Sequence, residues 1–528
     1  MTFQQTKKQI LQWGGLTIFI YLIFVIAFPL IPYIHYGSLM LDMEMILRDQ
    51  ARWFIYVYMA GLLLLFYAFY KITKLTHEFS KQNAPAKSAT LQSENKNSDG
   101  HRPSESNAVA GSATLQINTL KKHILSIGII SGIILLFLYP ITALDVALYV
   151  VFARNWVLYG GNPFTTPPET FITDPYIHLT GEYVTKTSSY GPIWEIVASI
   201  PIRLDITEIA SAIIATKIIS LSAYLFMAWL IGWKWRQKNV SQVTALSFFA
   251  LNPLVMLEAI GNGHNDMLMI AFITLGIVLF QNQKWIWATV ALTIACLIKI
   301  PALIFMPIFG LAVITTADSF RSRLMRGLIV ASIFLSLFFI FYRLMGPIPD
   351  VFAGVIDSFS RRSFSPAYAL HVIVREINPE FAKAILANTR YVFLLIYIFI
   401  LIQFMRKKLT LLEAGFVAYL AQIFLSNAFR IWYPLWLIPF AVLNLNSKTY
   451  WRVFLFSIAV QFSILSYYIL WRWHWRYWEW GLTGPLSAYW NYFTIMTPFT
   501  VSWTFTLPFL ADVIRLRSKR SHWVNMLD

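Results

Sequence analysis

Long apolar runs separated by short charged or Pro/Gly-rich segments dominate the pattern of hydrophobic and polar positions in this chain. A membrane-spanning helix needs about 20 apolar residues, because lipid offers no hydrogen-bonding partner to backbone N–H and C=O groups. The pattern therefore predicts an all-α fold, a polytopic transmembrane helical bundle of about 12–14 spans. The apolar runs lie near 13–34, 53–70, 123–143, 209–232, 242–260, 267–281, 285–299, 302–316, 327–345, 391–405, 410–428, 431–445, 451–470 and 493–512.

Three of these runs, between residues 267 and 316, are shorter than an ordinary span. We expect them to be buried, tilted or partly re-entrant. The composition agrees with a membrane protein, because 58% of the 528 residues are hydrophobic and only 13% are charged. The mean hydropathy of +0.59 exceeds what the core of a soluble protein requires.

The net charge of +17 and the pI of about 9.7 raise the question of nucleic-acid binding. The basic residues are dispersed over short loops without a nucleic-acid-binding motif, so we expect no nucleic-acid partner. Most of the 42 Lys and Arg fall in loops on one side of the predicted membrane. Cytoplasmic loops retain such residues, which predicts a multi-pass protein of the cell (plasma) membrane with both termini in the cytoplasm.

The chain divides into three predicted regions. The first span follows Lys7 and Lys8 but is too long for a signal peptide, so residues 1–76 are interpreted as an anchored transmembrane hairpin. Residues 77–120 are rich in Ser, Asn, Ala and Lys, which is typical of a flexible cytoplasmic linker. Residues 121–528 form the main transmembrane domain, and its single cysteine, Cys296, is predicted to be a core residue.

Three extracytoplasmic regions, residues 144–208, 346–390 and 471–492, contain enough polar sequence for a functional site. The last includes WRWHWRYWEW at 471–480, which is typical of an interfacial aromatic belt, although aromatic faces also stack on sugars. In the first region, GGNPF at 160–164 predicts a rigid turn. The segment from Tyr190 to Leu204 predicts a short amphipathic helix along the interface.

Asp145 is the first candidate for chemistry. It follows an apolar run directly and precedes a partly amphipathic, aromatic segment, so its carboxylate is expected at the outer membrane boundary, at the start of a helix. In that position it is suited to act as a general base that deprotonates an acceptor hydroxyl. The structural alternative is a helix cap or a partner for Arg154.

A second group of candidates lies at other outer helix ends. The segment GNGHND supplies His264, Asn265 and Asp266, about one turn beyond Glu258. A charge at that depth is costly, and Lys299 is a candidate ion-pair partner for Glu258. The alternatives are that Lys299 binds a lipid phosphate or extends to the interface. Further along the chain, Arg430 and Tyr433 are suited either to hold a phosphate or to anchor a helix. The His264 cluster lacks the further ligands that a zinc site needs, and no metal is expected.

The ordered succession of Asp145, GGNPF, TDPY, YGPIW, LNPLVMLEAIGNGHND and LIKIPALIFMP resembles the GT-C superfamily of integral-membrane glycosyltransferases. It is most similar to the prokaryotic polyprenol-phosphate-mannose-dependent α-mannosyltransferases over roughly residues 123–440. The resemblance implies a catalytic carboxylate in the first extracytoplasmic loop, which matches Asp145. The chain departs from relatives that carry two neighbouring acidic residues there, because Val146 follows Asp145.

The resemblance implies transfer of a hexose, mannose above all, from a polyprenyl-phosphate donor to an acceptor hydroxyl, with inversion at the anomeric carbon. The expected partners are membrane lipid, the lipid-linked donor, and a glycolipid, polysaccharide or protein acceptor. Tyr190, His264, Asn265, Asp266, Lys299, Arg430 and Tyr433 are the expected substrate-binding residues. No cofactor is expected, since neither a Rossmann fingerprint nor a P-loop occurs in the sequence. The alternative class is a transporter or lipid flippase without transferase activity.

Overall fold

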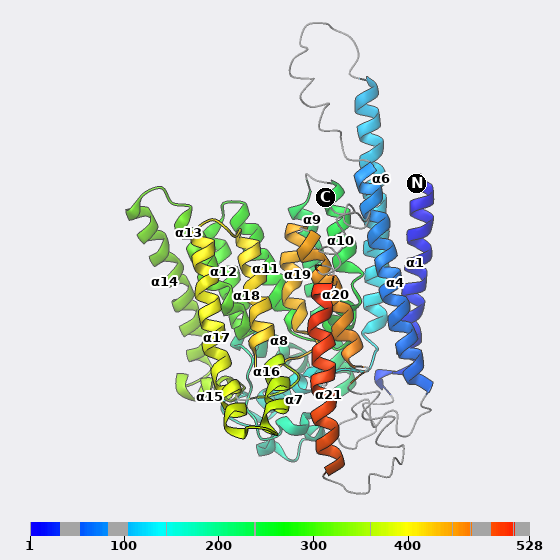
Figure 1. Cartoon of the computed structure of the whole chain (residues 1–528). Helices are drawn as coiled ribbons and strands as arrows, with labels where there is room; N and C mark the ends of the chain where they lie inside the picture. The colour runs from blue at the N-terminus through cyan, green and yellow to red at the C-terminus, as the bar shows by residue number, and fades with distance from the viewer. Residues whose placement is uncertain are drawn as a thin grey trace.

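A computed structural model describes residues 2–31, 53–82, 104–143, 145–236, 239–358, 361–445, 447–464, 466, 487–510 and 512. Helices make up most of these residues and no strand occurs among them, which confirms the predicted all-α bundle (Figure 1). In chain order the elements are α1 (Phe3–Ala27), α4 (Trp53–Gln82), α6 (Ser104–Leu135), α7 (Asp145–Tyr159), η1 (Pro168–Phe171), η2 (Ile177–Tyr183), α8 (Pro192–Arg203), α9 (Ile209–Lys234), α10 (Asn239–Ala250), η3 (Val255–Gly261), α11 (Asp266–Gln281), α12 (Trp285–Ile298), η4 (Ile300–Ile304), α13 (Met306–Thr315), α14 (Phe320–Leu344), α15 (Ile348–Ser358), α16 (Pro366–Arg375), α17 (Pro379–Met405), α18 (Leu411–Leu425), η5 (Tyr433–Leu437), α19 (Ile438–Asn444), α20 (Ser447–Ile464), α21 (Ser487–Thr506) and η7 (Leu507–Phe509).

Five helices in the described part of the chain are long and apolar enough to cross a membrane. They are Phe3–Ala27, Tyr56–Phe79, Ile209–Lys234, Phe320–Leu344 and Pro379–Met405. A sixth span is possible if Ser241–Ala250 and Val255–Gly261 count as one, although they are bent by 55°. The other apolar helices are shorter, including those predicted to be short between residues 266 and 315. The chain is therefore a multi-pass membrane protein in which short and broken helices accompany the full spans.

The break in the predicted span 242–260 follows from its sequence. Proline has no N–H and its ring crowds the preceding turn, so the helix stops before Pro253. Asn252 caps the next segment, because its Oδ1 accepts the Leu254 N–H at 3.0 Å. The chain then continues as the π-helical turn η3, which carries Glu258. Short π-helical turns are frequent at functional sites.

The N-terminal hairpin packs against the main bundle. Phe69 of α4 stacks on Phe454 of α20 at 5.4 Å between ring centroids and lies 5.7 Å from Phe248 of α10. The hydroxyls of Thr76 and Ser247 are 3.0 Å apart. Together with these contacts of α4, buried residues of α1 and α6 belong to the same hydrophobic core as the helices that follow.

The prediction of a flexible linker over 77–120 is wrong at both ends. Helix α4 continues to Gln82 and α6 begins at Ser104, while residues 83–103 lie outside the described part of the chain. Buried Ile117, Leu120 and Ile124 recur at helical spacing, so the second half of this segment has an apolar stripe that packs in the core. The low aromatic content of this segment led to the prediction of a linker, but the stripe consists of aliphatic side chains.

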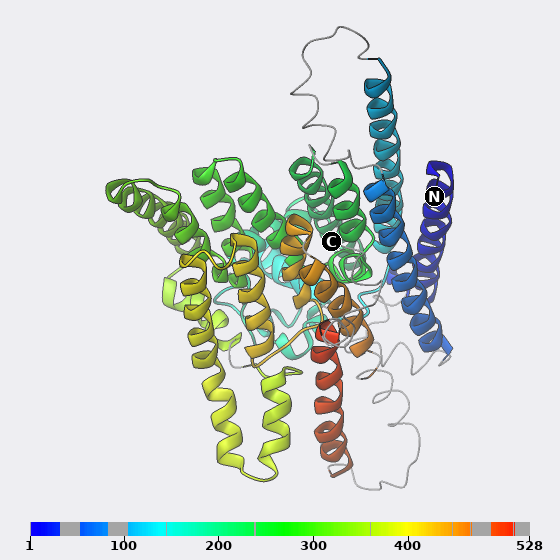
Figure 2. The same cartoon turned by 45° about the horizontal axis from the view of Figure 1, so that its top comes forward.

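Helices α7, α8, α15 and α16 gather at the end of the bundle opposite the N-terminus of α1 (Figure 1). After a turn of 45°, α16 and α17 are seen as a hairpin beside α21 (Figure 2). Helix α14 leans away at the edge of the bundle, and its side chains, including Leu335 and Phe339, are mostly exposed. Such an apolar face suits contact with lipid.

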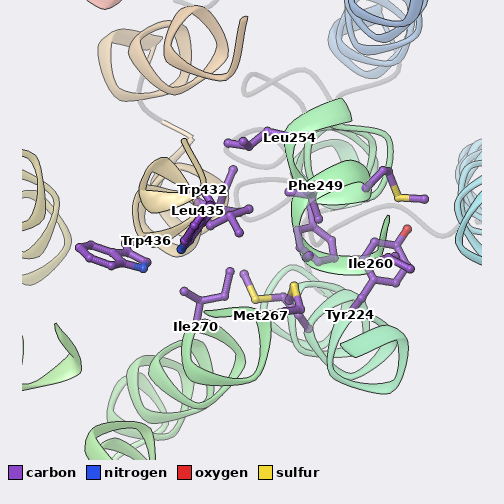
Figure 3. Close-up of a cluster of buried hydrophobic side chains, with 14 of the residues drawn as sticks. Tyr224, Phe249, Leu254, Ile260, Met267, Ile270, Trp432, Leu435 and Trp436 are labelled. Atoms are coloured by element: carbon purple, nitrogen blue, oxygen red, sulfur yellow. The ribbon is translucent and has the colours of Figure 1, made fainter. Parts of the chain in front are cut away.

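A hydrophobic cluster holds η5 against α11. Figure 3 shows Trp432, Leu435 and Trp436 facing Met267 and Ile270 of α11. All five side chains are buried. The segment from Trp432 to Leu437 is therefore fixed next to the first turn of α11.

The loop after α7 is fixed by a buried ion pair. Arg154 of α7 donates from Nη2 and Nε to Asp174 Oδ2 at 2.9 and 3.0 Å, and the Arg154 guanidinium also bonds to the Thr207 carbonyl. The guanidinium lies 4.7 Å from the centre of the Tyr176 ring. Arg154 thus binds TDPY, and the alternative that pairs it with Asp145 is wrong.

A buried carboxyl group lies in the first turn of α8. Glu195 is buried, and its Oε1 accepts a hydrogen bond from the Ser188 hydroxyl. The Oε2 atom has no hydrogen-bond partner within the described ranges. Burial raises the pKa of Glu195 from 4.5 to about 7, although the Ser188 hydrogen bond opposes the shift.

We predict that Asp174→Asn destabilises the protein by about 3–5 kcal/mol, because it leaves the buried guanidinium of Arg154 without its counter-charge. Thermal unfolding in detergent measures the effect. Glu380→Gln is the matched control, since Glu380 forms an exposed ion pair with Lys383 at 2.8 Å and its loss changes stability little. Equal melting temperatures for the two variants would contradict the prediction.

We also predict a pH-dependent effect of Glu195→Gln. The folded protein keeps the Glu195 proton up to about pH 7 while the unfolded chain loses it near 4.5, so stability falls as pH rises through this window. Glutamine removes that cost, and the variant should exceed the parent by about 3 kcal/mol at pH 8, with a smaller difference near pH 4.5. Melting curves across pH test this, with exposed Glu169→Gln as control; a pH-independent difference would refute it.

Candidate functional site

Asp145 is the first residue of α7, as predicted, and its side chain is 17% exposed. Its Oδ2 accepts a hydrogen bond from the Tyr190 hydroxyl at 3.5 Å and lies 3.6 Å from Nδ1 of His264. The carboxylate is thus held from two sides and keeps partial access to solvent. Three residues that are far apart in the sequence meet at this point.

Tyr190 is positioned by a close approach of two backbones. The Gly191 N–H donates to the Ile298 carbonyl at 3.0 Å, and a Cβ at Gly191 would lie 2.0 Å from the Leu297 carbonyl oxygen. Only glycine fits there. The Tyr190 ring packs edge-on against Tyr149 at 5.0 Å, and Lys299 Nζ lies 5.8 Å from its centre.

The phenol of Tyr190 is held in its neutral form. Burial raises the pKa of its hydroxyl well above 10, and the negative charge of Asp145 raises it further. A neutral phenol keeps its proton, which it donates to the carboxylate. Tyr190 therefore acts as a hydrogen-bond donor at this site.

His264 lies between two carboxylates. A left-handed turn at Gly263, with φ of +71°, places it between η3 and α11. Its Nε2 is 3.6 Å from Glu258 Oε2, and Nδ1 faces Asp145 at the same distance. The imidazole is fully buried and stacks on Trp432 with 3.9 Å between ring centroids.

Glu258 is fully buried and accepts three hydrogen bonds. Oε2 receives the Thr142 hydroxyl at 2.8 Å and Asn262 Nδ2 at 3.0 Å, while Oε1 receives Gln461 Nε2 at 2.6 Å. The expected pairing of Glu258 with Lys299 is wrong. The position of each residue within its apolar run predicted how deep it lies in the bundle. It did not predict which side chains of other helices lie beside it.

Lys299 pairs with Asp266 instead. Its Nζ lies 2.6 Å from Asp266 Oδ2, and Oδ1 of the same carboxylate accepts Trp436 Nε1 at 2.6 Å. Tyr433 stacks on Trp436 with 4.2 Å between ring centroids. Asn265, next to Asp266, is buried, and neither atom of its amide has a protein hydrogen-bond partner within the described ranges.

Two arginines add positive charge near the aromatic residues. Arg430 and Arg361 both interact electrostatically with Tyr433, and the Tyr433 N–H donates to the Arg430 carbonyl at 3.0 Å. The Arg361 guanidinium lies 4.7 Å from the centre of the Tyr183 ring. Arg361 comes from the loop between α15 and α16 and is partly exposed.

The structure thus brings the predicted residues into one region, with Asp145, Tyr190, His264, Asp266, Lys299 and Tyr433 joined through contacts. Sequence reasoning missed Arg361, whose loop has no motif, and Trp432 and Trp436, which an aromatic-rich chain does not single out. The aromatic run 471–480 lies outside the described residues. No group of three His, Cys, Asp or Glu suited to a metal ion occurs where the structure is described; the expected absence of a metal stays a prediction.

Comparisons with known proteins cover the segment that holds most of this site. Residues 110–315 match the family described as Alpha-(1->6)-mannopyranosyltransferase, N-terminal domain. The chain is 27% identical over 207 residues to Alpha-(1->6)-mannopyranosyltransferase B of Corynebacterium glutamicum, covering 35% of this chain and 33% of that protein. It is 21% identical over 174 residues to the A protein of that organism, covering 33% and 35%.

A third relative is Alpha-(1->6)-mannopyranosyltransferase A of Mycobacterium tuberculosis, which is 26% identical over 121 residues and is covered over 23% of each chain. The chain therefore spans about a third or less of the length of the curated relatives it matches. The matched segment 110–315 contains Asp145, Tyr190, His264 and Lys299. These matches confirm the expected resemblance: over residues 110–315 the chain is similar to the N-terminal domain of the α-(1->6)-mannopyranosyltransferase family.

Proposed function

We propose that this protein is a membrane mannosyltransferase that moves mannose from a polyprenyl-phosphate donor to an acceptor hydroxyl, with inversion at the anomeric carbon. The observation that carries the proposal is the partly exposed carboxylate of Asp145, held by Tyr190 and His264 within the segment that matches the transferase family. The names of the similar proteins support the sugar and the class of reaction.

In this proposal Asp145 is the general base. Its contacts with Tyr190 and His264 are both made by Oδ2, which leaves Oδ1 to accept the proton of the acceptor hydroxyl. The hydroxyl oxygen attacks the anomeric carbon while the bond from that carbon to the phosphate oxygen breaks. The phosphate leaves with the lipid on the opposite side of the sugar ring.

The departing phosphate gathers negative charge that cations stabilise. Arg361 and Arg430 are the proposed phosphate ligands, because guanidinium groups bind phosphate oxygens through paired hydrogen bonds. Lys299 is already paired with Asp266 and contributes little net charge. We assign Lys299, Asp266 and Tyr433 to shaping the sugar site, together with the unpaired amide of Asn265.

The proposed orientation places this site outside the cytoplasm and both termini inside. The basic segments 321–326 and 406–408 lie at the end of the bundle that also holds the N-terminus of α1, opposite α7 and α8 (Figure 1). Cytoplasmic loops are enriched in Lys and Arg, which supports this topology. A lipid-linked donor would then enter the site laterally from the outer leaflet.

A polytopic transporter or lipid flippase remains the alternative. The broken span formed by α10 and η3, with buried Glu258, is a feature that transporters also have. The similarity to mannosyltransferases supports the transferase. Transfer assays on purified protein separate the two, because a transporter forms no glycosidic bond.

We predict that Asp145→Asn lowers kcat by about 10²–10⁴-fold, because the amide cannot accept the hydroxyl proton, and leaves the donor KM nearly unchanged. The assay follows radiolabelled mannose from polyprenyl-phosphate mannose to an acceptor in detergent, with melting temperature as the folding control. Transfer at the parent rate would remove Asp145 from the mechanism. A parent protein without transfer would favour the transporter.

We further predict that Arg361→Gln raises the donor KM at least about tenfold, since a lost charge-assisted hydrogen bond costs about 1.5–3 kcal/mol. Arg362→Gln is the matched control, because the neighbouring Arg362 is exposed and has no described contact with the site. Steady-state kinetics at varied donor concentration measures both. Equal donor KM values in the two variants would exclude Arg361 from the phosphate site.

A further inference from the structure

We propose that His264 is a positioning residue that fixes Asp145 and takes up the proton that Asp145 removes from the acceptor, with Glu258 as the counter-charge behind it. The inference rests on the proposed role of Asp145 as general base. It assigns functions to two buried groups, one in the turn before α11 and one in η3. The reaction as written so far uses neither of them as a proton acceptor or counter-charge.

The geometry gives each ring nitrogen of His264 one carboxylate. Nδ1 faces Asp145 Oδ2 and Nε2 faces Glu258 Oε2, both at 3.6 Å. Trp432 covers a face of the ring, and the side chain is fully buried. Each nitrogen faces a carboxylate beyond hydrogen-bond distance, and neither has a hydrogen-bond partner among the described residues. The full burial of the ring favours a role behind Asp145 over direct contact with substrate.

Glu258 has the surroundings of an ionised carboxylate. Its oxygens accept hydrogen bonds from Thr142, Asn262 and Gln461, and three donors satisfy a carboxylate better than a neutral carboxyl group. Asn262 Nδ2 also donates to the Thr142 hydroxyl oxygen, so the Thr142 proton is free to point at Glu258. The donors come from three separate segments of the chain and together fix the position of the negative charge.

A buried carboxylate stabilises a positive charge that forms beside it. Among the described residues, His264 is the basic side chain within ion-pair distance of Glu258. Tyr58 of α4 also interacts electrostatically with Glu258 but is neutral, and Lys217 of α9 directs its ammonium group to the Leu138 carbonyl. An imidazolium at 264 would therefore be stabilised from both edges.

The proton balance follows from these positions. His264 starts neutral, with its proton on Nε2 toward Glu258 and its lone pair on Nδ1 toward Asp145. Asp145 takes the acceptor proton on Oδ1 as the new C–O bond forms and the bond to phosphate breaks. The carboxyl group then turns about its Cβ–Cγ bond and passes the proton to Nδ1. The imidazolium lies between two carboxylates, while the phosphate gains one negative charge as it leaves. The proton returns through Asp145 to water after product release.

This arrangement predicts how kcat depends on pH. Asp145 must be ionised and His264 neutral for the proton to pass between them, so kcat should fall as pH decreases, and the acidic limb should depend on both groups. Glu258 favours the imidazolium, and Glu258→Gln should therefore move that limb to lower pH and lower kcat. Asp145 and Glu258 are the carboxylates that face the ring, and Tyr190 faces Asp145 from the loop before α8.

The experiment compares the pH profiles of kcat and KM for the parent, His264→Gln and Glu258→Gln, with polyprenyl-phosphate mannose as donor. We expect His264→Gln to lower kcat by about 10–100-fold, to leave the donor KM within about threefold, and to leave an acidic limb that depends on Asp145 alone. His178→Gln, which replaces a partly exposed histidine of η2, is the matched control and should keep the parent profile.

The outcomes distinguish this inference from the proposed function. An inactive Asp145→Asn together with a His264→Gln variant that keeps the parent kcat and pH profile overturns the role of His264 alone. A raised donor KM at unchanged kcat in His264→Gln also overturns it, because that result indicates substrate binding. Should His264→Gln lose its melting transition, the Glu258→Gln profile decides, and an unmoved acidic limb refutes the proposal.

Discussion

The need to compensate charge inside an apolar bundle governs the arrangement of this site. Glu258 lies fully buried, where an unpaired carboxylate would be too costly to keep ionised. Its hydrogen bonds come from Thr142, Asn262 and Gln461, so segments far apart in the sequence converge on one group. His264 lies beside this network, with its Nε2 3.6 Å from Glu258 Oε2. The same constraint explains the buried pairs of Arg154 with Asp174 and Lys299 with Asp266.

Short and broken helices make that convergence possible. A continuous span presents side chains but few free backbone groups, whereas a helix end offers polar side chains and backbone at membrane depth. The break at Pro253, the left-handed turn at Gly263 and the end of α12 before Lys299 all lie near the site. Full spans such as α14 and α17 are mostly exposed on their sides and provide the lipid-facing perimeter.

The sequence predicted the all-α bundle, the short helices between residues 266 and 315, and the helix start at Asp145, because each depends on local apolar length or on Pro and Gly. The prediction from sequence was wrong where contacts between neighbouring helices determine which side chains pair. Glu258 and Lys299 were expected to pair because both lie deep in apolar segments, yet helix rotation gives them different partners. Arg361 has no motif, and tertiary structure alone brings it near Tyr433.

The pairing of charges also bears on the role proposed for Asp145. An arginine or lysine bound directly to a carboxylate stabilises its ionised form and weakens it as a proton acceptor. At this site Lys299 is bound to Asp266 and Arg154 to Asp174, whereas Asp145 contacts a neutral tyrosine and a histidine. Tyr190 also bears Lys299 on its ring, at 5.8 Å from the ring centre. The phenol therefore links Asp145 to the Lys299 ammonium group without a direct ion pair.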